Sequence, residues 1–233
     1  MRTIVVGICL STGLALAPSV HGTPLLVSYT TTGSTSNTVG NSIVESNGTE
    51  TVTATAWDAV GTGAFTAAAL DDYAGANYGL GVCTEAQVTS TCNAPYHEVN
   101  DSGQFDFVLF SFSHPASSVT IVINPVCDCS TNATYYVGTG SPSGETPLQL
   151  GTGTNSNQTT ADTQRTITIS GLGGATSILF GASTSGDDNF FKIASVSVTE
   201  GTVPEPATFG VVGMALIGLG LIGRRRKSRS STR

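Results

Sequence analysis

Four side chains capable of acid–base or metal chemistry lie within ten residues in the middle of the chain: His97, Glu98, Asp101 and Asp106. The carboxylates of Glu98, Asp101 and Asp106 suit Ca²⁺, a hard cation that takes oxygen ligands from loops. A pair of carboxylates could also perform the acid–base chemistry of glycoside hydrolysis. A third interpretation needs no ligand, because Asp101 can begin a turn while His97 packs at a strand edge.

We rank the turn interpretation first, Ca²⁺ binding second and catalysis third. The sequence contains no second carboxylate motif and no hydrolase signature built on Ser, His and Asp. The chain is therefore not predicted to be an enzyme, and Ca²⁺ is the cofactor that this segment could bind. Two further acidic pairs, Asp71-Asp72 and Asp187-Asp188, could reach a cation or could be solvated turn residues. Burial is expected for Trp57, but a sugar-stacking platform could also be formed by Trp57, Tyr73, Tyr78, Tyr96, Tyr135 and Tyr136.

The elements that would position these side chains are β-strands. Helical periodicity is almost absent from Thr23 to Gly201, where short apolar or alternating runs are separated by Gly, Asn, Ser, Pro and Asp. The predicted strands are Leu25–Thr31, Thr51–Ala59, Phe105–Phe112, Val119–Ile123, Thr134–Val137, Arg165–Ser170, Ser177–Ala182 and Phe190–Val198. About ten strands with turn-rich connections predict an all-β fold, a single antiparallel β-sandwich of the jelly-roll type.

Three segments carry more specific expectations. Phe105–Phe112 is the most apolar strand and should be central. Val119–Ile123 should follow it as an antiparallel neighbour after a turn at His114-Pro115. Ala64–Tyr73 could form either a helix or a strand, and Gly138–Gly153 should be a long surface loop because it is rich in Gly, Pro, Ser and Thr.

The charge of the segment between Thr23 and Val203 excludes some partners. It contains fifteen Asp and Glu residues and only two cations, Arg165 and Lys192, which gives a formal charge of −13. Such a surface repels nucleic acid and anionic lipid and favours solubility and cation binding. Nucleic acid is therefore not an expected partner.

The cysteines predict disulfides in an exported chain. Cys83, Cys92, Cys127 and Cys129 remain if a leader carrying the fifth cysteine is removed, and four cysteines allow three pairings. A Cys83–Cys92 bond would close a ten-residue loop and stabilise the fold by about 2–3 kcal/mol. It would leave Cys127 and Cys129 to pair in a tight ring, so the crossed arrangements stay open. A zinc site built on these cysteines is disfavoured, because no His lies at a useful spacing.

The first 22 residues predict a secretory signal peptide. Met1 and Arg2 precede a short apolar run, Ile4–Ala17, which small residues follow. Signal peptidase could cut after Ala17 or after Gly22, and we prefer Gly22 because Pro18 would follow the first cut. The domain that is exported is then 23–201.

The last residues, 202–233, predict a membrane-associated tail. Val203-Pro204-Glu205-Pro206 leads into an uncharged apolar run, Ala207–Gly223, and then into the basic cluster Arg224-Arg225-Arg226-Lys227 within the basic end 224–233. A helix over 207–223 would rise about 25 Å, slightly less than the ~30 Å apolar thickness of a bilayer. The arginines would stay on the cytoplasmic side.

This tail resembles the PEP-CTERM sorting signal. The resemblance implies recognition by an exosortase, a membrane-embedded cysteine transpeptidase-like protease that cuts near the Pro-Glu-Pro. It also implies a bacterial host, the export machinery as a partner, membrane contact through 207–223 before processing, and a final location at the cell surface or outside the cell.

The middle of the chain resembles a recurring pattern of exosortase-dependent surface proteins. The segments that carry this resemblance are Tyr78–Cys83, His97–Phe112 and Ser177–Val198, although Asn100-Asp101 stands where that pattern has Asp-Asn. That group has no generally assigned activity, so this second resemblance bears on the fold more than on the function. The pairing of a signal peptide with the tail Val203–Arg233 predicts a non-catalytic surface or extracellular-matrix protein of a bacterium that produces exopolysaccharide. The alternatives are a carbohydrate-binding module that acts on exopolysaccharide and, third, a glycan-active hydrolase.

Overall fold

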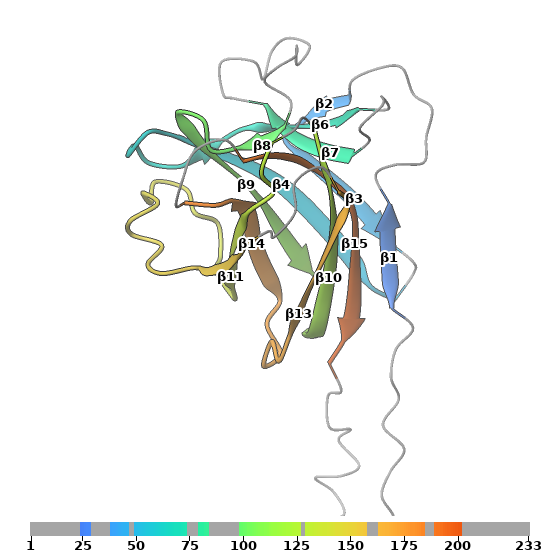
Figure 1. The fold of residues 1–233 in the computed structure, drawn as a ribbon. Helices are drawn as coiled ribbons and strands as arrows, with labels where there is room; N and C mark the ends of the chain where they lie inside the picture. Colours follow the sequence, from blue (N-terminus) through green and yellow to red (C-terminus); the bar gives the residue numbers. More distant parts are fainter. Residues whose placement is uncertain are drawn as a thin grey trace, which may run out of the picture. The chain divides into compact units, whose positions relative to one another are not determined.

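The structure of the protein is a computed structural model. It describes residues 24–28, 38–46, 49–73, 79–83, 98–126, 129–157, 163–184 and 189–201. These residues belong to one compact unit, His21–Gly201. Within the described ranges every regular element is a β-strand, and the strands form two antiparallel sheets (Figure 1). The all-β fold predicted from the sequence is therefore confirmed.

The first sheet has eight strands, and β15 pairs with four of them. Its path runs through β13 (Arg165–Ser170), β10 (Ala116–Pro125), β15 (Phe190–Glu200), β7 (Gly79–Cys83), β6 (Ala69–Tyr73) and β2 (Thr38–Gly40). Two short strands, β1 (Leu25–Ser28) and β8 (Val99–Asn100), also pair with β15. The long last strand therefore lies inside this sheet.

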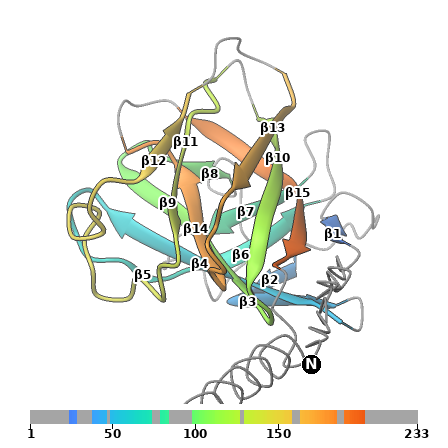
Figure 2. The same cartoon turned by 90° about the horizontal axis from the view of Figure 1, so that it is seen from below.

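The second sheet has seven strands, and β9 lies inside it. Its path runs through β12 (Thr154–Ser156), β11 (Ala133–Val137), β14 (Ser177–Ala182), β9 (Gln104–Phe112), β4 (Thr51–Val60) and β3 (Ser42–Ser46), with β5 (Thr66–Ala67) paired to β4. Figure 2 shows the two sheets as separate layers.

The main hydrophobic core lies between the two sheets. Along β4, buried Val52, Ala54 and Ala56 alternate with half-buried residues, as expected for a strand with one face on a core. Phe180 on β14 and Phe191 on β15 meet across the layers, with ring centroids 5.9 Å apart and nearly perpendicular planes. Apolar side chains from both sheets thus share one core, as in a β-sandwich.

A smaller core covers the other face of the second sheet. Phe107 of β9 packs edge-on against Phe65, with ring centroids 5.5 Å apart, and also contacts Tyr136. The loop 138–153 lies over this face, because the amide of Phe65 donates to the carbonyl of Glu145 at 2.7 Å. The predicted loop therefore has a structural role, since it shields apolar side chains of the sheet.

The strand after β9 lies in a different place from the one that we predicted. The strand predicted at Val119–Ile123 exists as β10, but it pairs with β13 and β15 in the first sheet rather than with β9. The chain crosses between the sheets at Ser113-His114-Pro115 instead of forming a hairpin. Alternating apolar residues identify the face that a strand buries, but they do not identify its neighbour. The segment 64–73 forms β5 and β6 and no helix.

A buried carboxylate holds this crossover. Glu50, 1% exposed, directly precedes β4, and its Oε1 accepts the backbone N–H of Ser113 and the Ser113 hydroxyl, each at 2.7 Å. The same oxygen accepts the backbone N–H groups of Thr51 at 3.1 Å and His114 at 3.3 Å. Glu50 thus adds hydrogen bonds to the contact between Thr51 and Ser113, where the Ser113 amide also donates to the Thr51 carbonyl at 3.0 Å and the Thr51 amide to the Ser113 hydroxyl at 2.9 Å.

Candidate functional site

Asp101, one of the predicted site residues, connects the turn before β9 to the start of β15. It is 3% exposed, and its carboxylate accepts the backbone N–H of Asn189 at 2.9 Å and the Asn189 side-chain amide. The Asn189 Oδ1 in turn accepts the backbone N–H of Asn132 at 2.9 Å. Asp101 therefore holds three separate segments together.

Asp106 lies opposite Asp58 in the β4–β9 ladder, and both side chains are buried. Its Oδ2 accepts the backbone N–H of Asn100 at 3.2 Å and the Asn100 side-chain amide at 2.8 Å, while Gln104 donates to both oxygens at 3.2–3.3 Å. Burial raises the pKa of Asp106 well above its usual value, and the nearby charge of Asp58 and a hydrogen bond between the two carboxyl groups raise it further. The donors from Gln104 and Asn100 act in the opposite direction.

The predicted Ca²⁺ ligands do not form a cluster. Glu98, Asp101 and Asp106 are all buried, but their carboxylate oxygens do not all lie within 4.8 Å of one another in the described part of the chain. His97 lies outside the described residues. The bonds of Asp101 go to Asn189, far away in the sequence, and both the turn role of Asp101 and Ca²⁺ binding by this segment stay predictions.

A buried lysine is the functional group that the sequence analysis overlooked. Lys192 is 1% exposed, although its neighbours Phe191 and Ile193 point into the main core, so its side chain lies on the opposite face of the first sheet. Burial lowers the pKa of Lys192, while the charges of Asp71 and Glu98 counteract this effect. The sequence feature that could have indicated this buried lysine is its place between two large apolar residues of a predicted strand.

The strand register explains how Asp71 comes near Lys192. Asp71 pairs with Gly81, and Leu80 pairs with Ile193, so Gly81 falls between Asp71 and Lys192 in one row across three strands. A glycine there places no side chain between them. Burial raises the pKa of Asp71 to about 6, against the opposing effect of Lys192. Asp72 is half-buried, and Asp187-Asp188 lies outside the described residues.

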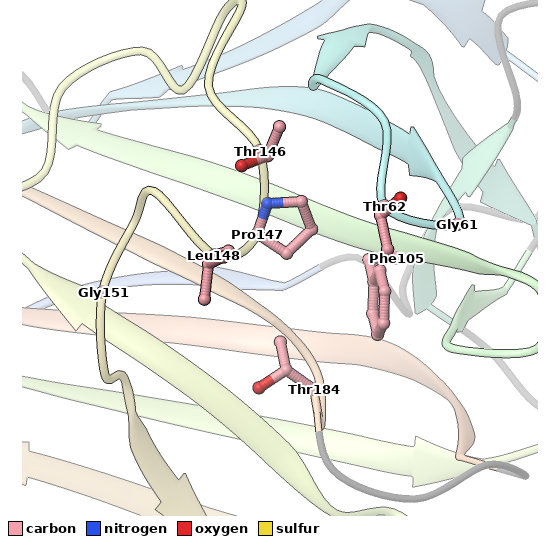
Figure 3. A pocket seen from close by; sticks show the side chains of 8 residues that line it. All are labelled: Gly61, Thr62, Phe105, Thr146, Pro147, Leu148, Gly151 and Thr184. Carbon is pink, nitrogen blue, oxygen red and sulfur yellow. The ribbon is translucent and has the colours of Figure 1, made fainter.

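A pocket of about 460 Å³ opens beside the loop 138–153 (Figure 3). Its apolar wall comes from Phe105 of β9 and from Pro147 and Leu148 of the loop. The remaining described lining residues are Gly61, Thr62, Thr146, Gly151 and Thr184. The threonine hydroxyls give the pocket hydrogen-bonding groups, and none of these lining residues carries a charge.

The aromatic residues that were predicted to form a sugar-stacking platform lie in different environments. Trp57 is half-buried, packs at the smaller core, and donates its indole N–H to the Thr55 hydroxyl at 3.1 Å. Tyr136 is buried in the same core, while Tyr135 packs against the main core. Among the described aromatic residues, Phe105 is the one that lines the pocket.

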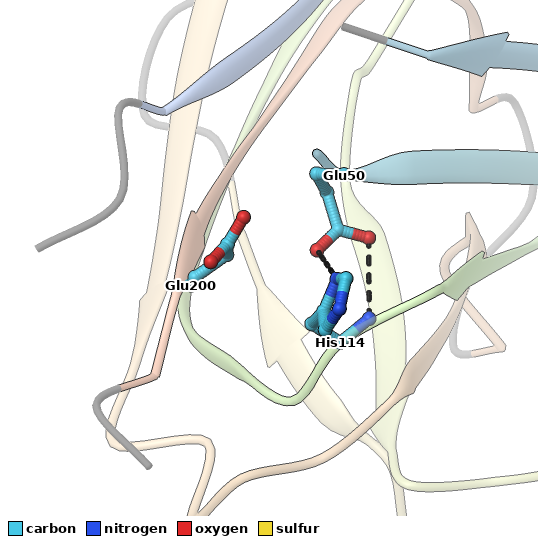
Figure 4. Close-up of side chains that lie close together, drawn as sticks. All are labelled: Glu50, His114 and Glu200. Carbon is cyan, nitrogen blue, oxygen red and sulfur yellow. Dashed lines mark hydrogen bonds and ion pairs between the residues drawn. The ribbon is translucent and has the colours of Figure 1, made fainter. Parts of the chain in front are cut away.

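Glu50, His114 and Glu200 meet at the crossover (Figure 4). Each offers one ligand atom, and these atoms all lie within 4.8 Å of one another, the only such group of three among the described residues. The Glu50 Oε2 is 3.3 Å from the Nδ1 of His114, whose side chain is 55% exposed. Because the three residues are far apart in the sequence, no motif could have predicted this cluster.

The disulfides stay a prediction. Cys83 ends β7 and is fully buried against Ala69, and Cys129 is half-buried. Cys92 and Cys127 lie outside the described residues, so the pairing is not defined.

Comparison with known families concerns the end of the chain. Residues 202–227 match the PEP-CTERM protein-sorting motif. This protein carries a PEP-CTERM sorting signal. The match includes the residues predicted to act in sorting: Val203, Pro204, Glu205, Pro206, Arg224, Arg225 and Arg226.

The PEP-CTERM signal determines where the protein is transported. It is an exported protein that an exosortase processes, and it is anchored in the membrane before it reaches the cell surface. The signal begins two residues after Glu200, the last residue of β15, so the folded domain and the signal are almost contiguous in sequence.

The remaining comparisons give no relative for the domain in front of the PEP-CTERM signal. No curated protein and no solved structure matches the chain. Among the described residues no helix is long and apolar enough to cross a bilayer, and the predicted span 207–223 lies outside them.

Proposed function

We propose that the protein is a non-catalytic surface or extracellular-matrix protein of a bacterium that produces exopolysaccharide. Its exported part, 23–201, is a jelly-roll-like β-sandwich between the signal peptide, 1–22, and the sorting helix, 207–223. The observation that carries this proposal is the PEP-CTERM match at 202–227, directly behind a two-sheet domain.

The distribution of carboxylates supports a non-catalytic role. The described residues that line the pocket include no carboxylate. Asp58 and Asp106 are paired across β4 and β9 and are buried, whereas the paired carboxyl groups of glycosidases flank an open cleft. These observations favour a structural or binding role over glycan hydrolysis.

Mass spectrometry of the mature protein from its native host tests this proposal. Processing predicts that the basic end, 224–233, is missing from the final product. A mature protein that keeps this end would instead be a plain membrane-anchored protein, and the proposal would be wrong in its main point.

Carbohydrate binding is the second candidate function, and the pocket beside Phe105 favours it. An apolar wall with a few hydroxyl groups suits a sugar, which presents both C–H surfaces and hydroxyls. Binding of host exopolysaccharide to the full chain should weaken by at least about tenfold in Phe105→Ala. Val44→Ala, which removes an exposed apolar side chain elsewhere, is the matched control. Equal binding by both variants would place the sugar elsewhere or remove this function.

A further inference from the structure

We propose that Glu50, His114 and Glu200 form a binding site for a divalent cation of the zinc type at the end of β15. Ligand atoms from all three residues lie within 4.8 Å of one another, close enough to share one ion. Figure 4 shows the three side chains converging from the turn before β4, the crossover after β9 and the end of β15. The site does not depend on the proposed function.

The spacing of two of these atoms matches a coordination geometry. Tetrahedral Zn²⁺ binds imidazole nitrogen and carboxylate oxygen at about 2.0–2.2 Å, so two neighbouring ligand atoms stand ~3.3–3.5 Å apart. The Glu50 Oε2 and the His114 Nδ1 are 3.3 Å apart. A direct charge-assisted hydrogen bond is usually shorter, about 2.7–2.9 Å. The observed separation therefore fits an edge of a zinc tetrahedron better than a tight ion pair.

Glu50 is oriented for this role before any ion binds. Its Oε1 accepts the Ser113 backbone N–H, the Ser113 hydroxyl and the His114 backbone N–H. These bonds fix the carboxylate so that Oε2 faces the imidazole. Such outer hydrogen bonds commonly hold metal ligands in place. A buried and rigid ligand reduces the conformational entropy that is lost on binding.

Ser113 also determines which proton a cation must displace. Its hydroxyl hydrogen is donated to Glu50 Oε1, so its oxygen can only accept from the His114 Nδ1, 3.1 Å away. The metal-free imidazole therefore carries a hydrogen on Nδ1. A cation that binds Nδ1 takes the place of this hydrogen, and the neutral imidazole then carries its hydrogen on Nε2 instead.

The ligand types select the class of cation. Ca²⁺ takes six to eight oxygen ligands, whereas an imidazole with carboxylates suits Zn²⁺ and similar first-row ions. Three protein ligands leave the fourth position of a tetrahedral ion for water. Because Glu200 belongs to the first sheet and Glu50 to the turn before a strand of the second, the ion would join the two sheets where the sorting signal begins.

Calorimetric titration of the full chain in detergent with Zn²⁺ tests the site, with Mg²⁺ at equal ionic strength to measure screening of the acidic surface. We expect one Zn²⁺ per chain and affinity at least about tenfold weaker in His114→Ala and in Glu200→Gln. Glu45→Gln, which removes an exposed charge outside the cluster, should bind Zn²⁺ as the wild type does. Co²⁺ should develop a visible absorption band that His114→Ala abolishes.

Three results would overturn the proposal. Zn²⁺ binding no stronger than Mg²⁺ binding would show that the cluster is only an ion pair. Unchanged Zn²⁺ affinity in both His114→Ala and Glu200→Gln would place the ion elsewhere. An equal loss in Glu45→Gln and Glu200→Gln would mean that net charge, and not coordination, attracts the cation. The side chains of His114 and Glu200 are at least partly exposed, so the His114→Ala and Glu200→Gln variants should fold.

Discussion

Asp58 and Asp106 lie directly opposite each other on β4 and β9, and both side chains are buried. Burial and the nearby charge of Asp58 both disfavour the ionised form of Asp106 and raise its pKa well above the usual value. A pKa that is higher in the folded than in the unfolded state contributes stability that is complete in acid and is lost as the pH rises through the folded value.

Asp106→Asn should remove this pH dependence. An asparagine amide can donate to Asp58 at every pH, so the variant should gain stability relative to the wild type between pH 5 and pH 8. Each unit by which the pKa is raised corresponds to about 1.4 kcal/mol. Urea unfolding at both pH values measures the change. Asp101→Asn is the control, because it disturbs the bonds from Asn189 and should destabilise the protein at both pH values. A wild type and an Asp106→Asn variant with parallel pH profiles would contradict the raised pKa of Asp106.

Ca²⁺ should stabilise the protein no more than Mg²⁺ does. The carboxylates of Asp101 and Asp106 already accept hydrogen bonds from Asn189, Asn100 and Gln104, and a cation would have to displace these donors. Melting curves with Ca²⁺, Mg²⁺ and a chelator, at equal ionic strength, measure the difference. A larger response to Ca²⁺ that disappears in Asp101→Asn with Asp106→Asn would instead establish the calcium site predicted from the sequence.

Lys192→Met should destabilise the protein strongly at pH 8. The substitution leaves the carboxylates of Asp71 and Glu98 buried without the cation beside them, and removal of one partner of a buried pair typically costs about 3–5 kcal/mol. The loss should be smaller at pH 5, because Asp71, with a pKa of about 6, is then largely neutral. Denaturant unfolding at both pH values measures this. The double variant with Asp71→Asn should recover part of the loss, and a loss independent of pH would contradict the coupling.

Glu50→Ala should destabilise the crossover. It removes the acceptor of the Ser113 hydroxyl and of the His114 amide, and hydrogen bonds to a charged group contribute about 1.5–3 kcal/mol each. A loss of at least about 2 kcal/mol is expected in chemical unfolding with a chelator present, so that no bound ion contributes. Glu45→Gln, at an exposed position, should leave the unfolding free energy unchanged. Equal stability of the two variants would mean that solvent replaces these bonds.

Gly181→Ala tests the close contact between β14 and β9. A Cβ atom at Gly181 would overlap the carbonyl oxygen of Asp106 and the ring of Phe107. Overpacking of this kind typically costs about 1–3 kcal/mol. Gly140→Ala is the matched control, since a Cβ there meets no atom within 4 Å. Thermal unfolding of both variants measures the difference, and a stable Gly181→Ala would show that the two strands can move apart.

The sequence predicted local structure better than spatial neighbours. Strands such as β4 and β13 were recognisable because their apolar residues alternate, a pattern that one buried face imposes. The prediction that β10 pairs with β9 was wrong. The hydrogen bonds that hold the crossover before β10 come from Glu50, which lies more than sixty residues upstream. The PEP-CTERM signal was readable because all its parts are contiguous.

The candidate sites were harder to predict for the same reason. Glu98, Asp101 and Asp106 are close in sequence, yet they take part in three different contacts. Lys192 and Asp71 approach each other only through the register of three strands. Glu50, His114 and Glu200 come together only after both sheets have formed.

The position of β15 determines how the domain carries a mechanical load. Once the protein is held through its C-terminal signal, drag on the domain acts through residue 201, directly after β15. Because β15 pairs with β10 on one side and with β1 on the other, such a force loads both ladders at once. An edge strand pulled from its end could be peeled away one hydrogen bond at a time. Attachment through an interior strand makes the whole sheet resist the pull.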